Sequence, residues 1–265
     1  MSYAKTFSKL RRRKEKALVP FVVIGDPDYA TSLKIVKTIV GAGADVLELG
    51  FPFSDPIADG PTIQGADVRS LNKNIDTDKC FKFIKEVRKF TDIPIGLLVY
   101  YNLIYQRGIK KFYYDCKLAG VTSVLVADVP VEEAKDIIEL ARKYKIDTVF
   151  IVGPLTDVKR LKLISKKCRG FVYIVSRLGV TGARGDLQDN TLKLIRRVRK
   201  NTKLPLCVGF GISKPEHVKA VCKAGAHGVI VGSAIVKIIE KNLKNKKKML
   251  NKIEAYVKEM KQATK

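Results

Sequence analysis

Short apolar runs alternate with amphipathic, lysine-rich segments along almost the whole chain. The runs have the length and β-branched content of buried strands, and the segments between them carry apolar residues at helical spacing. Eight strands are predicted, at 18–24, 46–49, 95–99, 123–127, 148–152, 170–175, 206–208 and 228–231. Helices are predicted at 29–42, 77–90, 106–119, 131–144, 157–167, 190–200, 214–224 and 247–262.

Eight alternations of strand and helix indicate a parallel sheet, and eight such units in about 250 residues are the size of a closed (β/α)8 barrel. We therefore predict an α/β fold, a single (β/α)8 TIM barrel that spans residues 1–265 as one domain. The first dozen residues place Phe7 and Leu10 among arginines and lysines. They are predicted to form an extra N-terminal helix that covers the amino-terminal end of the barrel.

The composition is that of a globular chain, because 46% of its 265 residues are hydrophobic. No apolar run approaches the roughly 20 residues that span a bilayer, and no signal peptide is visible, so no membrane partner and a cytoplasmic location are expected. The five cysteines are widely spaced without a Cys-x-x-Cys pair. This spacing argues against a disulfide framework and against a zinc site, and no metal ligands are predicted.

A net charge of +25 is the main argument for a different class of function, since basic surfaces attract nucleic acid. The lysines and arginines are spread over most predicted helices, and they are densest in residues 237–265. No sequence motif of a nucleic-acid-binding module is present. The charge is therefore interpreted as solvated helix faces, and no nucleic-acid partner is expected.

The segment 46–62 (VLELGFPFSDPIADGPT) sets three acidic residues into apolar or turn-forming sequence. The two-residue period of a strand puts Val46 and Glu48 on one face, with Glu48 near the strand's carboxyl end. Asp55 and Asp59 follow in a loop rich in proline and glycine. Buried carboxylates are paired, hydrogen-bonded or used, so the segment suits acid/base chemistry on a small molecule. The alternative is that Glu48 forms a structural ion pair and that both aspartates start turns.

Barrel enzymes place their sites at the carboxyl ends of the strands, where Asp128 and Tyr173 are also predicted to lie. Glycine loops follow three of the last strands, at 179–185, at 209–211 and at 232–233, and a short extra helix is predicted from Ser233. Backbone N–H groups in such loops bind phosphate. A single loop of this kind is more often a turn, but three on adjacent strands predict a phosphorylated ligand.

Five segments together carry a resemblance to a known family: residues 48–64 (ELGFPFSDPIADGPTIQ), 124–130 (VLVADVP), 179–184 (GVTGAR), 209–213 (GFGIS) and 231–236 (VGSAIV). In this order, over nearly the whole chain, the sequence resembles the tryptophan synthase α subunit family. The resemblance implies retro-aldol cleavage of indole-3-glycerol phosphate to indole and glyceraldehyde 3-phosphate, for tryptophan biosynthesis. It also implies a β subunit as partner in an α2β2 heterotetramer. Pyridoxal phosphate is expected only in that partner, and no cofactor is expected in this chain.

The resemblance implies two catalytic residues, Glu48 and Asp59. Cleavage needs a proton at the indole carbon that bears the side chain, loss of the glycerol hydroxyl proton, and stabilisation of positive charge at the ring nitrogen. Glu48 is suited to shuttle the proton and Asp59 to accept the indole N–H.

The same resemblance implies further roles. The phosphate would be bound by Gly182, Gly211, Gly232 and Ser233, and the indole and glycerol parts by Phe21, Leu98, Leu125, Tyr173, Phe210 and Ile230. Each of these six also fits ordinary barrel core. Thr181 would be a substrate-contacting lid residue that latches to Asp59, Arg177 a second lid residue, and Asp55 part of the partner interface. His217 and His227 fit no role in the reaction and are predicted to be structural.

Two alternatives stay open. A stand-alone indole-3-glycerol phosphate lyase of the same barrel type would release indole without a partner. A binding protein that uses the basic surface without catalysis is disfavoured by the presence of both Glu48 and Asp59 together with the phosphate loops.

Overall fold

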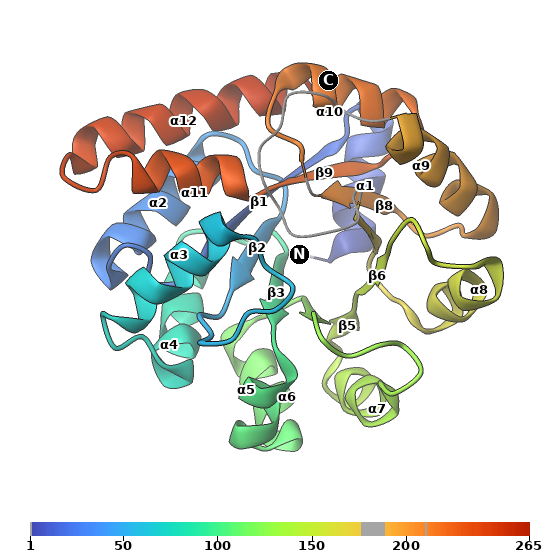
Figure 1. The fold of residues 1–265 in the computed structure, drawn as a ribbon, viewed down its shortest axis with the longest axis horizontal. Coiled ribbons are helices and arrows are strands. Elements are labelled where there is room, and N and C mark those ends of the chain that lie inside the picture. The colour runs from blue at the N-terminus through green and yellow to red at the C-terminus, as the bar shows by residue number, and fades with distance from the viewer. Residues whose placement is uncertain (1, 176–188, 210) are drawn as a thin grey trace.

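The computed structural model describes residues 2–175, 189–209 and 211–265, and it shows a ring of parallel strands surrounded by helices (Figure 1). The nine strands form one sheet in the order β5-β4-β3-β2-β1-β9-β8-β7-β6. The strands are β1 (Ala17–Val23), β2 (Leu47–Gly50), β3 (Ile95–Val99), β4 (Ser123–Val126), β5 (Asp147–Thr148), β6 (Phe150–Val152), β7 (Val172–Val175), β8 (Leu206–Gly209) and β9 (Gly228–Val231).

The two outer strands of that order belong to one short segment, which closes the ring. β5 pairs with β4, and β6 pairs with β7. Val149 lies between them and donates its backbone N–H to Val124 O on β4 at 3.1 Å. The strand predicted at 148–152 therefore exists as two short pieces, because it turns from one neighbour to the other. Eight strand positions in a closed ring confirm the prediction of a TIM barrel.

The helices are α1 (Tyr3–Arg12), α2 (Tyr29–Gly41), α3 (Pro61–Leu71), α4 (Thr77–Arg88), α5 (Tyr101–Arg107), α6 (Ile109–Ala119), α7 (Lys135–Tyr144), α8 (Val158–Lys167), α9 (Asp189–Asn201), α10 (Pro215–Lys223), α11 (Ser233–Glu240) and α12 (Lys246–Gln262). Local sequence explains several starting points. Asp28, Asp76 and Asp157 each accept a hydrogen bond from a backbone N–H of the first turn of α2, α4 and α8.

Three helix predictions were wrong in detail. The sequence analysis gave no helix at α3, which lies directly after the loop that carries Asp59. The single helix predicted at 106–119 is two helices, because Gly108 has a φ of 81° and separates α5 from α6. The helix predicted from 131 begins at Lys135, after a turn.

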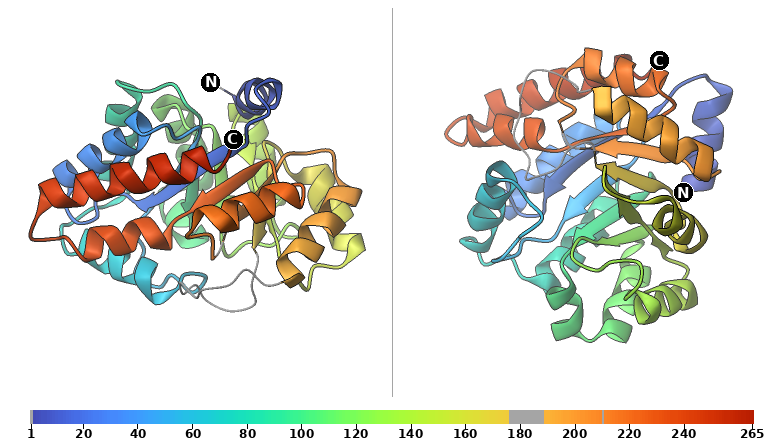
Figure 2. Two further views of the ribbon diagram at one scale, coloured as in Figure 1. Left: turned by 90° about the horizontal axis from the view of Figure 1, so that it is seen from above. Right: turned by 45° about the vertical axis from the view of Figure 1, so that its right-hand side comes forward.

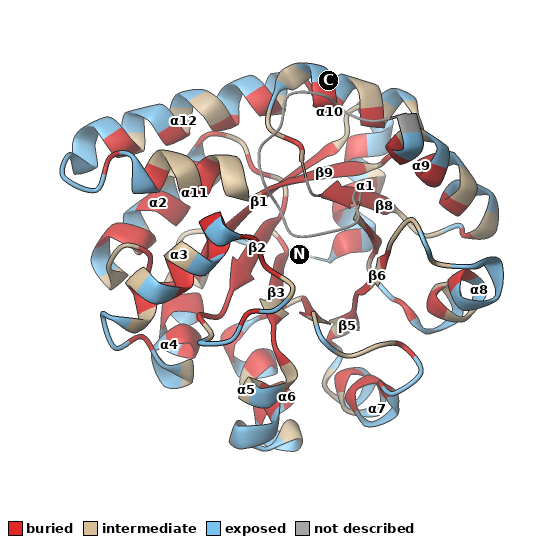
Figure 3. Ribbon diagram, viewed as in Figure 1, coloured by how far each residue is buried: buried red, intermediate tan, exposed pale blue. Residues whose placement is uncertain are grey.

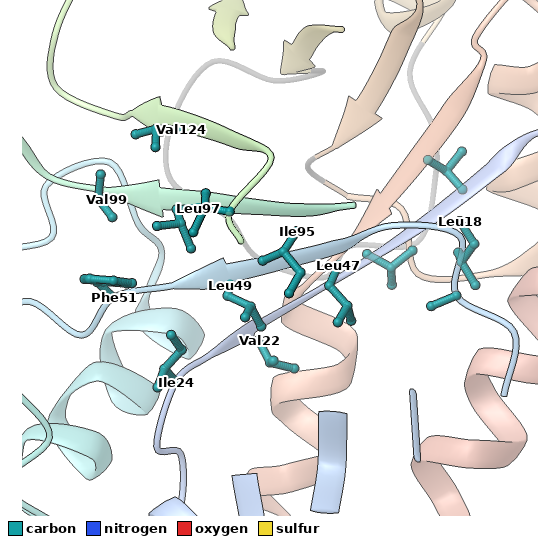
Figure 4. Packing of buried hydrophobic residues seen from close by; sticks show 14 of the residues in the cluster. Leu18, Val22, Ile24, Leu47, Leu49, Phe51, Ile95, Leu97, Val99 and Val124 are labelled. Carbon is teal, nitrogen blue, oxygen red and sulfur yellow. The ribbon is translucent and has the colours of Figure 1, made fainter. Parts of the chain in front are cut away.

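Apolar side chains form two layers, one inside the ring and one between the ring and the helices. On β1, Val19 and Phe21 belong to the inner cluster, whereas Leu18 and Val22 belong to the outer one. Figure 4 shows part of the outer layer, in which the side chains of Leu47 and Leu49 join those of neighbouring strands. This alternation leaves the inner face of each strand free to line a site at the barrel's carboxyl end.

Helix α1 closes the amino-terminal end of the barrel, as predicted. Tyr3 is 1% exposed, and its hydroxyl group lies 2.8 Å from Ser123 Oγ at the start of β4. Its ring also meets the edge of Phe171, with ring centroids 5.2 Å apart. Figure 2 shows α1 standing off one end of the strand ring. The opposite, carboxyl-terminal end is the one on which the candidate site lies.

The last helix joins the beginning of the barrel to its end. Lys16 donates its backbone N–H to Thr264 O at 2.8 Å, just before β1. The ammonium group of Lys261 lies 2.9 Å from Asp45 Oδ2 and 3.2 Å from Glu15 Oε2, and all three side chains are mostly buried. Figure 3 shows how the inner faces of the outer helices are buried while their outer faces stay exposed. Among the described helices, none is long and apolar enough to cross a bilayer.

Candidate active site

Glu48 lies on β2 and shares a face with Val46, as the two-residue period predicts, and this face points into the barrel. Val46 belongs to the inner apolar cluster, and Leu47 and Leu49 belong to the outer one. Glu48 is 3% exposed, and Oε2 has no hydrogen-bond partner among the described residues. Burial, together with the nearby charge of Asp59, raises the pKa of Glu48 to about 8. The structural ion pair considered for Glu48 is absent from the described part of the chain.

Asp59 lies at the end of the loop between β2 and α3, directly before Gly60, the N-cap residue of α3. Its side chain is 9% exposed and accepts a hydrogen bond from the hydroxyl group of Tyr100 at 2.6 Å, measured to Oδ2. Gln64, one turn into α3, donates to the backbone oxygen of Asp59 at 2.8 Å. Burial raises the pKa of Asp59, and the hydrogen bond from Tyr100 partly offsets that rise.

Tyr100 is a site residue that the sequence analysis missed. It directly follows β3, and besides donating to Asp59 it accepts the backbone N–H of Ala58 at 3.1 Å. Its ring stacks on Phe53, with centroids 5.1 Å apart. One aromatic side chain therefore contacts three residues of the loop that carries Asp59. Its place at the carboxyl end of a predicted strand was the signal that could have identified it.

Asp67 on α3 was missed as well. It is 4% exposed, and its Oδ2 atom is buried without a hydrogen-bond partner among the described residues. Burial, with the charge of Asp59 as the next cause, raises the pKa of Asp67 to about 8. Its signal in the sequence is an acidic residue on the same helical face as the apolar Ile63 and Ala66.

Five of the six residues predicted to hold the indole and glycerol parts are described, and they lie on the inner face of the ring. Phe21 on β1 stands directly opposite Glu48 on β2 in the sheet register. Tyr173 on β7 is buried, and the charges of both Glu48 and Asp59 help to raise the pKa of its phenol. Leu125 on β4 and Ile230 on β9 are buried, and Leu98 on β3 is partly buried.

The predicted phosphate-binding residues divide between described and undescribed parts of the chain. Gly232 is the N-cap residue of α11, and Ser233 is the first residue of that helix. The first N–H groups of a helix lack partners within it and favour an anion. Gly211 follows β8. The remaining predicted site residues, Arg177, Thr181, Gly182 and Phe210, lie outside the described residues.

Asp128 and both histidines form hydrogen bonds or close contacts with backbone groups of other segments. Asp128 accepts the backbone N–H of Tyr101 at 2.8 Å, in the first turn of α5. His217 Nδ1 lies 3.1 Å from Gly211 O, and His227 Nδ1 accepts the backbone N–H of Leu206. Asp55 is exposed and accepts a hydrogen bond from the hydroxyl group of Ser54. Within 2–175, 189–209 and 211–265, no group of three His, Cys, Asp or Glu residues is arranged to hold a metal ion.

Residues 7–265 match the family model described as "Tryptophan synthase alpha chain". The chain belongs to the tryptophan synthase α chain family. It is 56% identical to the tryptophan synthase α chain of Methanothermobacter thermautotrophicus over 253 residues, which cover 96% of this chain and 93% of the relative. The tryptophan synthase α chain of Methanoregula boonei is 49% identical over 256 residues, 97% of each chain.

Solved structures agree with this membership of the tryptophan synthase α chain family. A chain from the tryptophan synthase α2β2 complex of Pyrococcus furiosus superimposes with a TM-score of 0.87 at 39% identity, over 93% of this chain and 98% of that one. The Pyrococcus complex is described as mutually activated. The barrel is therefore the architecture that this chain shares with the Pyrococcus chain.

Proposed function

We propose that Glu48 and Asp59 are the catalytic carboxylates with which this member of the tryptophan synthase α chain family cleaves indole-3-glycerol phosphate to indole and glyceraldehyde 3-phosphate. The observation that carries the proposal is the burial of both carboxyl groups at the carboxyl end of the barrel, close enough for the charge of Asp59 to raise the pKa of Glu48. A strand holds Glu48 and a loop holds Asp59.

Glu48 is proposed to move the protons. Its protonated carboxyl group delivers a proton to the indole carbon that bears the side chain, and the ring nitrogen becomes positive. The carboxylate then takes the proton of the glycerol hydroxyl group, the C–C bond breaks to form the aldehyde, and the bonding electrons return to the ring. A pKa of about 8 keeps both protonation states accessible near neutrality.

Asp59 is proposed to stabilise the positive ring nitrogen by accepting its N–H. This role requires the ionised form, and the hydrogen bond from Tyr100 favours that form. A fixed carboxylate in a water-poor site stabilises developing positive charge more strongly than water does.

The rest of the site is proposed from the resemblance together with the positions described above. Gly211, Gly232 and Ser233 bind the phosphate together with Gly182, chiefly through backbone N–H groups. The inner-face residues bind the organic part, with Phe210 among them. Thr181 and Arg177 act from the lid. We also propose that residues 1–265 act as one domain.

A β subunit is the proposed partner, in an α2β2 assembly like that of Pyrococcus furiosus. The loop that ends in Asp59 exposes Asp55 on its outer side and, two residues later, an isoleucine side chain that is 77% exposed, Ile57. Burial of this apolar side chain against a partner would stabilise the assembly. Contact with this loop would couple the partner to the position of Asp59.

We further propose that this chain works without a cofactor of its own, since the two carboxyl groups account for each proton and charge of the cleavage. Pyridoxal phosphate is assigned to the partner only. A cytoplasmic location is part of the same proposal and is supported by the five free cysteines.

The test is indole release from indole-3-glycerol phosphate by the purified chain, with and without a tryptophan synthase β subunit. We expect slow release that rises many-fold with the β subunit. Glu48→Gln and Asp59→Asn should each lower kcat by about 10²–10⁴-fold. Brisk release that the β subunit does not change would favour the stand-alone lyase, and full activity of Glu48→Gln would remove Glu48 from the mechanism.

A further inference from the structure

Helix α3, which begins directly after the loop of Asp59, is fixed to the turn after β1 by an ion pair that the mechanism above does not use. The guanidinium group of Arg69 on α3 donates two hydrogen bonds to the carboxyl group of Asp26, of 2.7 Å to Oδ1 and 2.9 Å to Oδ2. Asp26 is 1% exposed, and the side chain of Arg69 is 18% exposed. Because both groups are planar, a pair with two parallel bonds fixes direction as well as distance.

A second contact holds α3 at the same place. The hydroxyl group of Ser70 donates to the backbone oxygen of Ile24 at 2.6 Å, and both residues are fully buried. A Cβ atom added at Gly25 would lie 2.8 Å from Ser70 Oγ and 2.5 Å from Cγ1 of Ile75. The turn after β1 is therefore packed too closely against α3, and against the segment after it, for one to slide past the other.

The other end of α3 is bonded to the residue that carries the proposed catalytic carboxylate. Gln64 Nε2 donates to Asp59 O at 2.8 Å, and the backbone N–H groups of Ile63 and Gln64 donate to Gly60 O at 2.9 and 3.0 Å. Arg69 lies about one and a half helical turns further along. A displacement of α3 at Arg69 would therefore be passed along the helix to Asp59.

The same guanidinium group also faces α11, the helix that is proposed to bind phosphate at its start (Figure 1). Arg69 Nη1 lies 3.7 Å from Oε1 of Glu240, the last residue of α11. The side chain of Glu240 is 49% exposed, and Gly232 lies at the opposite end of that helix. Since exposed ion pairs contribute little, the pair with Asp26 is the stronger contact of Arg69.

We propose that Arg69 is a positioning residue, which through Asp26 holds α3 on the end of β1 and thereby keeps Asp59 where it can accept the indole N–H. The proposal rests on the proposed function for its catalytic consequence only. β1 also pairs with β2, and in that register Phe21 stands opposite Glu48. The same strand thus fixes both proposed catalytic carboxylates, one through the sheet and the other through Arg69.

The experiment measures indole release and hydrogen–deuterium exchange of residues 59–66 on the complete chain and its variants. Arg69→Met removes the guanidinium group but keeps an apolar stem, and Arg69→Lys keeps the charge without the two parallel bonds. Asp26→Asn combined with Arg69→Met leaves no buried charge unpaired. Arg88→Gln is the matched control, because Arg88 is also partly buried and donates to backbone oxygens before β3 and β4, at the opposite end of the barrel. Circular dichroism and urea unfolding establish that each variant is folded in the assay.

We expect the exchange protection of residues 59–66 to fall about tenfold in Arg69→Met and in the double variant, because the anchor of α3 is lost. In both variants kcat should fall about tenfold or more, with KM changed less than about threefold, since Asp59 is proposed to act in the transition state. Arg69→Lys should lie between these variants and the wild type. Arg88→Gln should leave protection and kcat within about twofold of the wild type.

The route through Asp59 is tested by repeating Arg69→Met in an Asp59→Asn background. There Arg69→Met should lower kcat no further, because two residues that act through one group are not additive. An equal further loss of kcat in that background would overturn the proposal. A rise in KM at unchanged kcat would overturn it as well, because it would assign Arg69 to the phosphate helix.

Wild-type protection of residues 59–66 together with wild-type kcat in a folded Arg69→Met would reduce the ion pair to a structural contact and would also overturn the proposal. Should Arg69→Met not fold, the double variant decides the question. Absence of indole release by the wild type would count against the proposed function and not against the positioning role, which the exchange data test by themselves.

Discussion

At the scale of single residues, the site depends on carboxyl groups whose protonation is set by burial. Glu48 has no cation partner in the described part of the chain, and its charged form is disfavoured by the loss of water and by Asp59. A buried acid of this kind makes stability depend on pH. Its pKa is raised in the folded state, so the folded state binds more protons than the unfolded state between about pH 4.5 and 8.

Glu48→Gln is therefore expected to stabilise the protein increasingly as the pH rises. The wild type loses stability from about pH 4.5 up to the folded pKa of about 8, where Glu48 becomes charged in both states. The amide cannot ionise, so the free energy of unfolding at pH 8 should rise by about 4 kcal/mol relative to the wild type, because the pKa rises from 4.5 to about 8 on folding and each pKa unit corresponds to about 1.4 kcal/mol. Urea unfolding at pH 5 and at pH 8 measures the difference, which should nearly vanish at pH 5. An equal effect at both pH values would contradict it.

Tyr100→Phe is expected to move the acid side of the pH–rate profile upward. Its hydroxyl group lowers the pKa of Asp59, and without it burial acts alone, so a larger share of Asp59 is protonated near pH 6. We expect kcat/KM to fall about tenfold at pH 6 and less at pH 8, since one hydrogen bond to a charged group contributes roughly 1.5–3 kcal/mol. Tyr105→Phe, at an exposed tyrosine of the next helix, is the control. An unchanged pH–rate profile would show that Tyr100 does not control the ionisation of Asp59.

The side-chain alternation of one strand was enough to predict that Glu48 and Val46 share a face of β2. The role of Tyr100 could not be predicted in the same way, because it depends on a contact with a residue 41 positions away. The burial of Asp67 was not predictable either, because burial of a particular side chain follows from packing that a local pattern does not specify.

At the scale of elements, the strands were predictable and the helices around the site were less so. Fully buried parallel strands are continuous apolar runs, which are visible in any sequence. Helix α3 has Gly65 and polar residues within it, so its helical pattern is weak, and it is fixed mainly by Pro61 at its start and by packing on the barrel. The break at Gly108 needed a left-handed backbone that a periodic pattern does not reveal.

Gly232→Ala tests the element that is proposed to bind phosphate. A Cβ atom at Gly232 would lie 3.0 Å from Cδ1 and 3.3 Å from Cβ of Phe21, so the turn before α11 or the Phe21 ring must shift. We expect KM for indole-3-glycerol phosphate to rise about tenfold with a smaller change in kcat, because the turn is proposed to contact the phosphate and not the reacting atoms. The matched control is Gly41→Ala on α2, where a Cβ atom has nothing within 4 Å. Unchanged KM in Gly232→Ala would contradict the assignment of this turn.

At the scale of the whole molecule, the barrel is closed at its amino-terminal end by a helix that the sequence analysis predicted from two apolar residues. Within this helix, Tyr3 is 1% exposed and lies against Ser123 and Phe171. The excess of lysine and arginine was interpreted as solvated helix faces, and that interpretation stays a prediction.

Tyr3→Ala is expected to destabilise the protein by about 3–5 kcal/mol, because it removes a fully buried aromatic side chain from a site that cannot collapse around the gap. Chemical unfolding monitored by circular dichroism measures this loss. Lys5→Ala, at an exposed position on the same helix, should leave the free energy of unfolding within about 0.5 kcal/mol of the wild type. A loss below about 1 kcal/mol for Tyr3→Ala would mean that α1 is dispensable for stability.

The pairing of β1 with β9, together with the hydrogen bond from Lys16 to Thr264, has a consequence for the timing of synthesis. β1 is among the first strands to leave the ribosome, whereas its partner β9 is made about 200 residues later. At about 10 residues per second, β1 would wait roughly 20 seconds with one apolar edge unpaired. The nascent chain would therefore expose the apolar edge of β1 throughout the interval between the synthesis of β1 and that of β9.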